Sequence, residues 1–330
     1  MFRERWVAVL LVAYVSFALS YEYHDRIERP KESARIRYHG SILDGSGENA
    51  VRTRLLIPWV AEFAANTLTR TAGFTPVKAF NAAYFCLNVA GLLLFFGAMW
   101  RLLVDWSPRP LAIAGILLAA FMMALTFRDQ FFHPWSFWEP AFFALGMLLL
   151  RSGQIAAFAA LCAVAVVNRE TSIFLPLAFC VHCWRGASPR PVALMAGGTL
   201  LGCTALLLVL RSVTGAEPPL DGYLQENFQR NLATGWYSLL LNAHLLGPVW
   251  WLAARGLPDA PALVRSFALA LIPYLGLLVT VSVWWEIRYW LTAAPVLVPA
   301  ILAGIQSYFP GPARPNGCKC PIISSATETG

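Results

Sequence analysis

The stretch from Ala79 to Trp100, AFNAAYFCLNVAGLLLFFGAMW, decides the fold class of this chain. It contains no Asp, Glu, Lys or Arg. Its length exceeds the ~20 residues with which an α-helix crosses the ~30 Å hydrocarbon core of a bilayer. The sequence therefore predicts a transmembrane helix at this position.

Similar uncharged runs lie on both sides of this stretch. Longer ones fall at residues 6–21, 110–127, 191–210, 237–254, 266–285 and 289–313, and shorter ones at 140–150, 152–167 and 171–184. The composition agrees, because 58% of the residues are hydrophobic and only 13% are charged, whereas a soluble domain is far more polar. We expect an all-α, polytopic transmembrane bundle of about ten helices.

The charged residues between the runs predict the orientation of the chain. If the N-terminus is cytoplasmic, most Lys and Arg of the short connections fall on the cytoplasmic side, which is the usual bias of membrane proteins. The basic segment 22–54 disagrees, because this orientation places it outside. A cleaved signal peptide is the alternative for residues 6–21, but an uncleaved first helix fits the charge pattern better. We expect an N-in, C-in protein of a bacterial inner membrane.

One domain is expected over residues 1–310, with an outer loop at 22–54, an interfacial helix at 55–68 and a disordered cytoplasmic tail at 311–330. The net charge of +7 suits anionic lipid headgroups better than nucleic acid. Cys318 and Cys320 form a lone C-x-C pair, which is weak evidence for a metal. The sequence identifies no cofactor, although it is compatible with a divalent metal.

The most informative polar cluster is Asn168-Arg169-Glu170-Thr171, which separates two apolar arms that are each short for a membrane span. An Arg and a Glu recessed in this way are costly unless they face protein or water, so the cluster predicts a polar cavity. An ordinary interfacial turn, with Thr171 or Ser172 capping the next helix, is the alternative.

Further candidates follow other apolar runs on the predicted outer side. His133 and Glu139 stand in the aromatic segment HPWSFWEP, which is also typical of an interface belt. Glu286 and Arg288 join the last two runs, where a structural ion pair is the alternative. Arg54 precedes the predicted interfacial helix and is placed to contact a headgroup or a donor phosphate.

Several of these segments together resemble a known superfamily. YHGSILDG at 38–45, RLLIP at 54–58, the Asn-Arg-Glu-Thr cluster and WEIR at 285–288 are similar to uncharacterised bacterial membrane proteins of the GT-C type. GT-C proteins are polytopic glycosyltransferases that move a sugar from a polyprenyl-phosphate donor to an extracytoplasmic acceptor. The resemblance extends from Met1 to about residue 310.

The resemblance implies a catalytic acid soon after the first helix. That role falls on Asp25, with Glu22 and Asp44 as substitutes. The acid would deprotonate the acceptor hydroxyl, while arginines stabilise the departing phosphate. The implied substrate-binding residues are Arg54, His133, Glu139, Asn168, Arg169, Glu170, Glu286 and Arg288.

Two other classes of protein fit the same pattern. A transporter or flippase of a lipid-linked or envelope substrate is the main alternative, although transporters usually show internal repeats with matching polar breaks near the bilayer midplane. A non-catalytic assembly protein of the cell envelope is the third, and it would tolerate substitution of Asp25, Arg169 and Glu170. Polar residues that gather on one side favour the enzyme.

Overall fold

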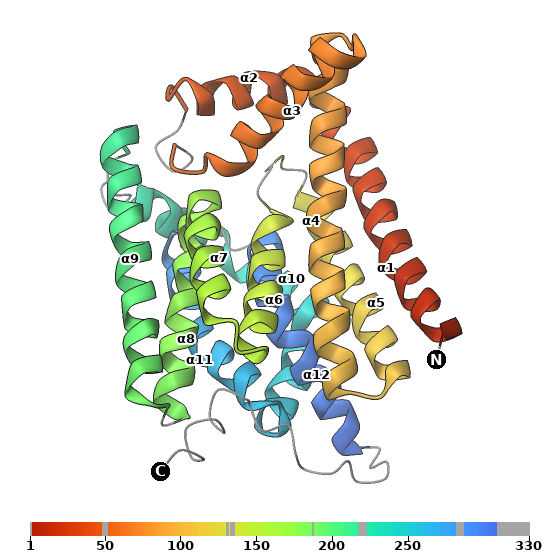
Figure 1. Cartoon of the computed structure of the whole chain (residues 1–330), viewed down its shortest axis with the longest axis vertical. Coiled ribbons are helices and arrows are strands. Elements are labelled where there is room, and N and C mark those ends of the chain that lie inside the picture. The colour runs from red at the N-terminus through yellow and green to blue at the C-terminus, as the bar shows by residue number, and fades with distance from the viewer. Residues whose placement is uncertain are drawn as a thin grey trace.

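The computed structural model describes residues 2–47, 52–129, 132, 136–186, 188–216, 223–281 and 287–308. Every regular element in these ranges is helical, which confirms the all-α bundle (Figure 1). The first half contains α1 (Phe2–Tyr23), the π-helical turn η1 (His24–Glu28), α2 (Glu32–Leu43), α3 (Leu56–Ala72), α4 (Pro76–Trp106), α5 (Arg109–Leu125), η3 (Thr126–Asp129) and α6 (Trp138–Arg151). The second half contains α7 (Ile155–Asn168), η4 (Glu170–Ile173), α8 (Phe174–Arg185), α9 (Arg190–Thr214), α10 (Tyr223–Gly256), η5 (Leu257–Asp259), α11 (Ala262–Val281), η6 (Ile287–Ala293) and α12 (Ala294–Tyr308).

The ten apolar runs fall on ten different helices, α1 and α4 to α12. Five segments are long and apolar enough to cross a membrane, namely Trp6–Glu28, Pro76–Trp106, Arg109–Arg128, Arg190–Thr214 and Trp290–Tyr308. The chain is therefore a multi-pass integral membrane protein. The remaining helices are shorter or more polar, so the number of ten crossings stays a prediction.

The bundle is covered at one end by two helices from the segment that follows α1. Figure 1 shows α2 and α3 lying across this end, which we call the α2–α3 end, while α1, α4 and α9 run along the long axis. The segment 22–54 was expected as a loop, but the structure shows that much of it is helical. A buried ion pair between Glu28 and Arg35, described below, lies within this segment.

Helix α3 confirms the helix expected at 55–68 and extends it to Ala72, where Gly73 ends it with a left-handed φ of 65°. Its small residues Ala61 and Ala65 are buried against the beginning of α4. Its other face leaves Trp59 and Phe63 exposed, with Phe63 76% accessible. An aromatic face of this kind suits the membrane interface.

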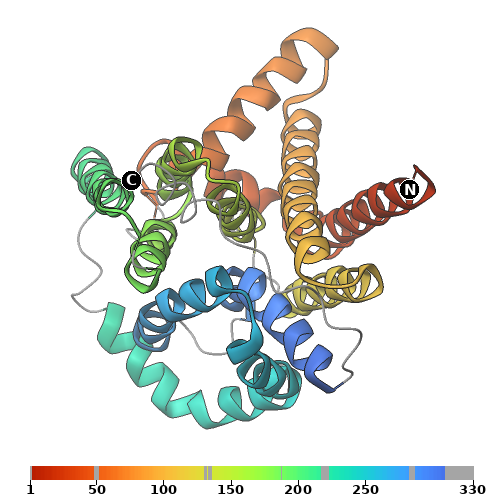
Figure 2. The same ribbon diagram turned by 60° about the horizontal axis from the view of Figure 1, so that its bottom comes forward.

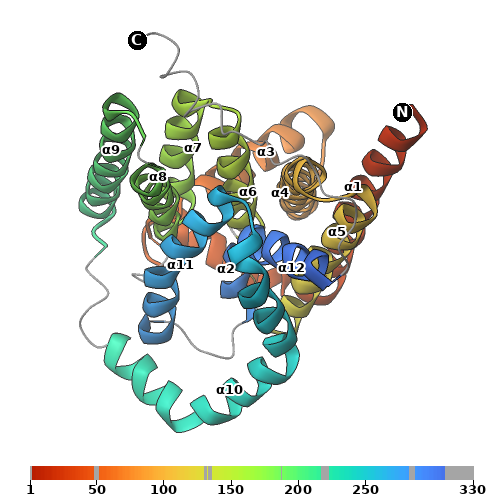
Figure 3. The same ribbon diagram turned by 90° about the horizontal axis from the view of Figure 1, so that it is seen from below.

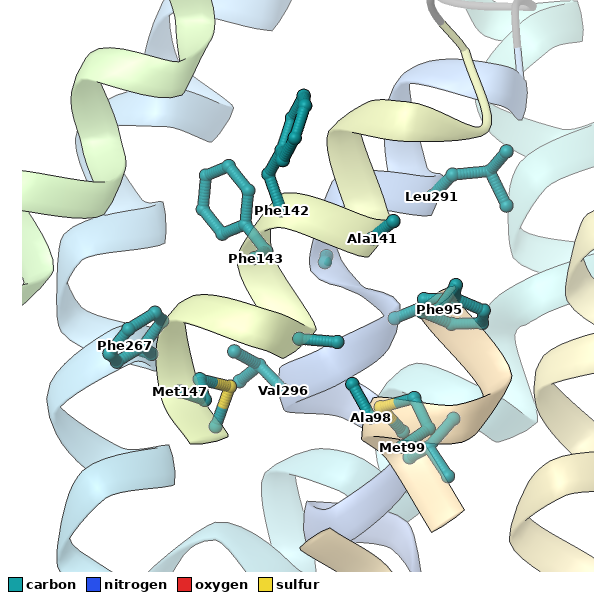
Figure 4. Close-up of a cluster of buried hydrophobic side chains, with 14 of the residues drawn as sticks. Phe95, Ala98, Met99, Ala141, Phe142, Phe143, Met147, Phe267, Leu291 and Val296 are labelled. Carbon is teal, nitrogen blue, oxygen red and sulfur yellow. The ribbon is translucent and has the colours of Figure 1, made fainter. Parts of the chain in front are cut away.

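The core lies where α4, α6, α11 and α12 meet. Figure 4 shows Phe95 and Met99 of α4 close to α6 and α12, and Phe267 of α11 beside Met147 of α6. In lipid these helices gain little from the hydrophobic effect, so close van der Waals packing holds them together. Gly256 and Gly304 give the closest approach, because a Cβ on Gly256 would lie 1.9 Å from the carbonyl oxygen of Ala300.

Helix α10 curves around the outside of the bundle. Figures 2 and 3 show α10 curving around α11 and α12. Pro248 lies inside α10, and Pro273 and Pro299 lie inside α11 and α12. Proline removes a backbone hydrogen bond and bends a helix, which fits the curvature of α10.

Candidate functional site

A buried ion pair stands at the α2–α3 end, where α7 breaks. Arg169 has an extended backbone, with φ −162° and ψ 135°, and this residue separates α7 from η4. Its guanidinium donates to the carboxylate of Glu139 in the first turn of α6, and Thr171 donates its hydroxyl to the same carboxylate. Glu139 is 1% exposed and Arg169 is 5% exposed. The break predicted from the short apolar arms is therefore the point where two buried charges meet.

The next residue makes a second ion pair in another direction. Glu170 accepts two hydrogen bonds from Arg211 in the last turn of α9, at 3.2 Å from Nε and 3.0 Å from Nη2. Thr53, which is fully buried, donates its hydroxyl to the same carboxylate at 2.9 Å. Paired hydrogen bonds fix the plane of the guanidinium against the carboxylate. Glu170 therefore joins α9 to the connection between α2 and α3.

That connection contacts both the broken helix and the end of α9. The amide of Leu55 donates to the carbonyl oxygen of Val167 at 3.2 Å, and Arg52 donates to the carbonyl oxygen of Gly215 at 3.3 Å. Arg54 stands between Thr53 and Leu55, and both neighbours contact the break. The structure thus places the backbone of Arg54 beside the break that contains Asn168, Arg169 and Glu170, and Arg169 in turn contacts Glu139. We call these five residues, with Thr53 and Arg211, the polar cluster.

Two polar side chains at the break lack a hydrogen-bond partner among the described residues. Asn168 is 1% exposed, and both its amide oxygen and its amide nitrogen are unpaired. The hydroxyl of Ser172, in a fully buried residue, is unpaired as well. Buried polar groups without partners are costly, so such groups normally meet water or a ligand. The binding role expected of Asn168 stays a prediction.

The three acids expected to be catalytic lie apart from these contacts. Glu22 pairs with Arg26, and Asp25 pairs with Arg29 at 3.5 Å. Both carboxylates belong to exposed i,i+4 pairs, with 41% of the Glu22 side chain and 51% of the Asp25 side chain accessible.

Asp44 differs from these two acids, because it lies on the connection that reaches the polar cluster. It accepts bonds from the amide and hydroxyl of Ser46 at 2.8 Å and 2.6 Å. These hydrogen bonds lower the pKa of Asp44 below its ordinary value.

The sequence analysis missed a second buried ionic group, between η1, α2 and α4. Glu28 and Arg35 are fully buried and pair at 3.2 Å, and Glu28 also contacts His24 at 2.8 Å and Asn88 at 3.0 Å. Phe80, Tyr84 and Phe132 surround the Arg35 guanidinium, with ring centroids 4.6–5.5 Å from Cζ. Burial lowers the pKa of Arg35, while Glu28 opposes that shift. Only the π-helical turn, marked by the bond from the Arg29 amide to the His24 carbonyl, brings Glu28 inward, and no sequence pattern predicted it.

Helix α3 is joined to this group by His39. Its two ring nitrogens lie 2.8 Å from the Tyr84 hydroxyl and 3.0 Å from the carboxylate of Glu62. Hydrogen bonds from His39 and from Asn66 hold the pKa of Glu62 below its ordinary value. The contact fastens α3 to both α2 and α4.

Three predicted residues cannot be placed in the site. His133 and Glu286 lie outside the described residues. Arg288 belongs to η6, but its side chain is outside the described part. Within the described ranges, no group of three His, Cys, Asp or Glu residues is arranged to hold a metal ion. Comparison of the chain with protein-family models, with curated proteins and with solved structures finds no match.

Proposed function

We propose that this protein is a membrane glycosyltransferase that takes a sugar from a polyprenyl-phosphate donor and passes it to an acceptor at the α2–α3 end. The observation that carries the proposal is the charge of the polar cluster. Among the described residues, the cluster and the adjoining Arg52 contain four arginines, Arg52, Arg54, Arg169 and Arg211, and two glutamates, Glu139 and Glu170. An excess of arginine at such a site in a lipid-embedded bundle favours an anionic lipid substrate.

The ion pairs Arg169–Glu139 and Arg211–Glu170 orient the two guanidinium groups and add no net charge. Each glutamate fixes one arginine, so the guanidinium groups are held in place before a ligand binds, and such preorganisation lowers the cost of ordering them. Arg54 enters the cluster on a connection held by Thr53 and Leu55. We assign Arg54 and Arg169 to the donor phosphate, and the unpaired amide of Asn168 to a sugar hydroxyl.

The transfer step needs a base for the acceptor. Asp44 is the expected acid that lies on the connection carrying Arg54, and an aspartate is ionised at neutral pH. In the proposed step the acceptor hydroxyl gives its proton to Asp44, and its oxygen forms a bond to the anomeric carbon. The bond from that carbon to the phosphate oxygen breaks, and the lipid phosphate leaves with the electron pair beside the arginines.

Binding is the first test. The full chain in nanodiscs is titrated with undecaprenyl phosphate and, separately, with the uncharged polyprenol. We expect tighter binding of the phosphate, and a loss of about tenfold or more in Arg54→Gln, because a hydrogen bond to a charged group is removed. Arg70→Gln, an exposed arginine at the other end of α3, is the matched control and should bind as the parent does. Equal binding of the two lipids would contradict the proposal.

Turnover is the second test. A panel of undecaprenyl-phosphate-linked sugars is supplied with membrane extract as acceptor, and release of undecaprenyl phosphate is measured. Asp44→Asn should abolish release and leave lipid binding unchanged. If proteoliposomes instead move the sugar lipid across the bilayer without releasing the lipid phosphate, the protein is a flippase and the enzyme proposal fails.

A further inference from the structure

An apolar groove lies far from the polar cluster, between α8 and α9. Its volume is about 360 Å³, and its walls are formed by Cys180, Cys183 and Trp184 of α8 and by Ala193, Ala196 and Gly197 of α9. Figure 1 shows that the connection between α8 and α9 lies at the end of the bundle opposite α2 and α3. The volume is at the lower end of the range for sites that hold small ligands.

The groove opens toward lipid because α9 is a peripheral helix. Only 11% of the apolar window of α9 is buried, the lowest value among the five candidate spans. Figure 3 shows α9 at the edge of the bundle beside α7 and α8. Leu194 and Leu201 of α9 are 66% and 73% exposed, and Trp184 at the end of α8 is 80% exposed. A lipid chain can therefore enter the groove from the side.

Two arginines lie next to the lining residues along the chain. Arg185 follows Trp184 at the end of α8 and Arg190 begins α9, and both are exposed. Arg190, Ala193 and Gly197 follow one face of α9, because residues three, four or seven apart share a helix face. No Asp or Glu occurs between residues 171 and 216. The apolar walls and two exposed positive charges therefore adjoin at the connection between α8 and α9.

We propose that this groove binds one anionic glycerophospholipid, with an acyl chain between α8 and α9 and the phosphate at Arg190 and Arg185. The two arginines favour an anionic lipid over a neutral one. A neutral lipid would fill the apolar walls but leave both arginines unused, whereas a lipid phosphate contacts them at the surface depth that Trp184 marks. The lipid acts here as a bound structural ligand, at the opposite end from the polar cluster.

Two neighbouring glycines allow a matched test. A Cβ added at Gly197 or at Gly198 meets no atom within 4 Å, so neither position resists a larger side chain. Gly197 lines the groove, while Gly198 is exposed and does not belong to its walls. Gly197→Leu should fill the groove and Gly198→Leu should leave it open, with equal gains in helix propensity. Thermal unfolding of both variants in detergent verifies that each remains folded.

Native mass spectrometry of the full chain, titrated with palmitoyl-oleoyl phosphatidylglycerol or phosphatidylcholine, gives the readout. We expect one retained phosphatidylglycerol, at least a tenfold loss in Gly197→Leu, and parent binding in Gly198→Leu. Arg190→Gln should reduce the preference for phosphatidylglycerol over phosphatidylcholine about fivefold. Equal binding in the two glycine variants would overturn the proposal. A dimer that dissociates in Gly197→Leu but not in Gly198→Leu would also overturn it, because the groove would then be a contact between two copies of the chain. Binding of undecaprenyl phosphate at the polar cluster should not change in any of these variants.

Discussion

Glu28 and Arg35 form an ion pair with 3.2 Å between Oε1 and Nη2, and neither side chain has exposed surface. The pair joins the end of the first membrane helix to α2, so it holds the cover of the α2–α3 end in place. Removal of one partner from a buried pair leaves an uncompensated charge, which costs far more than the pair itself contributes.

Arg35→Gln should therefore lower the free energy of unfolding by about 3–5 kcal/mol. Arg29→Gln is the control, since Arg29 is 77% exposed and pairs with Asp25 at 3.5 Å, and it should cost less than ~1 kcal/mol. Unfolding in detergent, followed by tryptophan fluorescence, measures both. Equal effects of the two substitutions would show that the buried pair does not anchor α2.

Acid should loosen α3 from α2. The pKa of Glu62 is lowered by its bonds to His39 and Asn66, so the stability that it contributes is present above the ordinary glutamate pKa of about 4.3 and is lost as pH falls through the lowered value. Limited proteolysis of the connection between α2 and α3 should quicken below about pH 4. Glu62→Gln should remove that additional acid sensitivity, whereas an unchanged pH profile in this variant would exclude Glu62 as its source.

Thr53→Val tests whether the polar cluster positions Arg54. The substitution keeps the side-chain volume and removes only the hydrogen bond to Glu170, so about 1 kcal/mol of stability should be lost. Affinity for undecaprenyl phosphate should fall about fivefold, since the connection that carries Arg54 is less well held. Thr67→Val is the control, because the Thr67 hydroxyl donates to the Phe63 carbonyl within α3. Unchanged affinity in Thr53→Val would separate Thr53 from ligand binding.

Gly256→Ala should destabilise the crossing of α10 and α12. The new methyl group would overlap backbone atoms of Ala300 and Gly304, which cannot move aside as a side chain does. Overpacking of this kind costs about 1–3 kcal/mol. Gly97→Ala in α4 meets nothing within 4 Å, and it should be neutral or slightly stabilising. Thermal unfolding of the two variants gives the comparison, and a stable Gly256→Ala protein would contradict the close crossing.

The helices could be predicted because their signal is local. An uncharged run either reaches the length of a membrane span or falls short, and all ten runs lie on helices. The break at Asn168–Thr171 was predictable for the same reason, since its two arms are short. The partners at the break were not predictable. Glu170 meets Arg211 and Thr53, which are distant in the chain, and no periodicity links residues that meet only after the bundle has packed.

The acids expected to be catalytic show the opposite difficulty. Asp25 follows the first helix, where the resemblance to GT-C proteins places an acid, but the turn in which it lies directs it to the surface. Glu28, three residues later, is the carboxylate that enters the protein. Sequence distance from a helix end could not show which carboxylate faces inward, because that depended on a local change of helix type.

The π-helical turn at His24–Glu28 changes the direction in which the following side chains point. Each residue advances an α-helix by ~100°, so one extra residue in this turn rotates the later residues about the helix axis relative to α1. Below the turn, Tyr14 and Phe17 are exposed on the lipid-facing side of α1. At the end of the turn, the carboxylate of Glu28 faces inward. One continuous helix thereby serves two unrelated surfaces, and deletion of a single residue between Asp25 and Glu28 would rotate Glu28 by ~100° relative to α1.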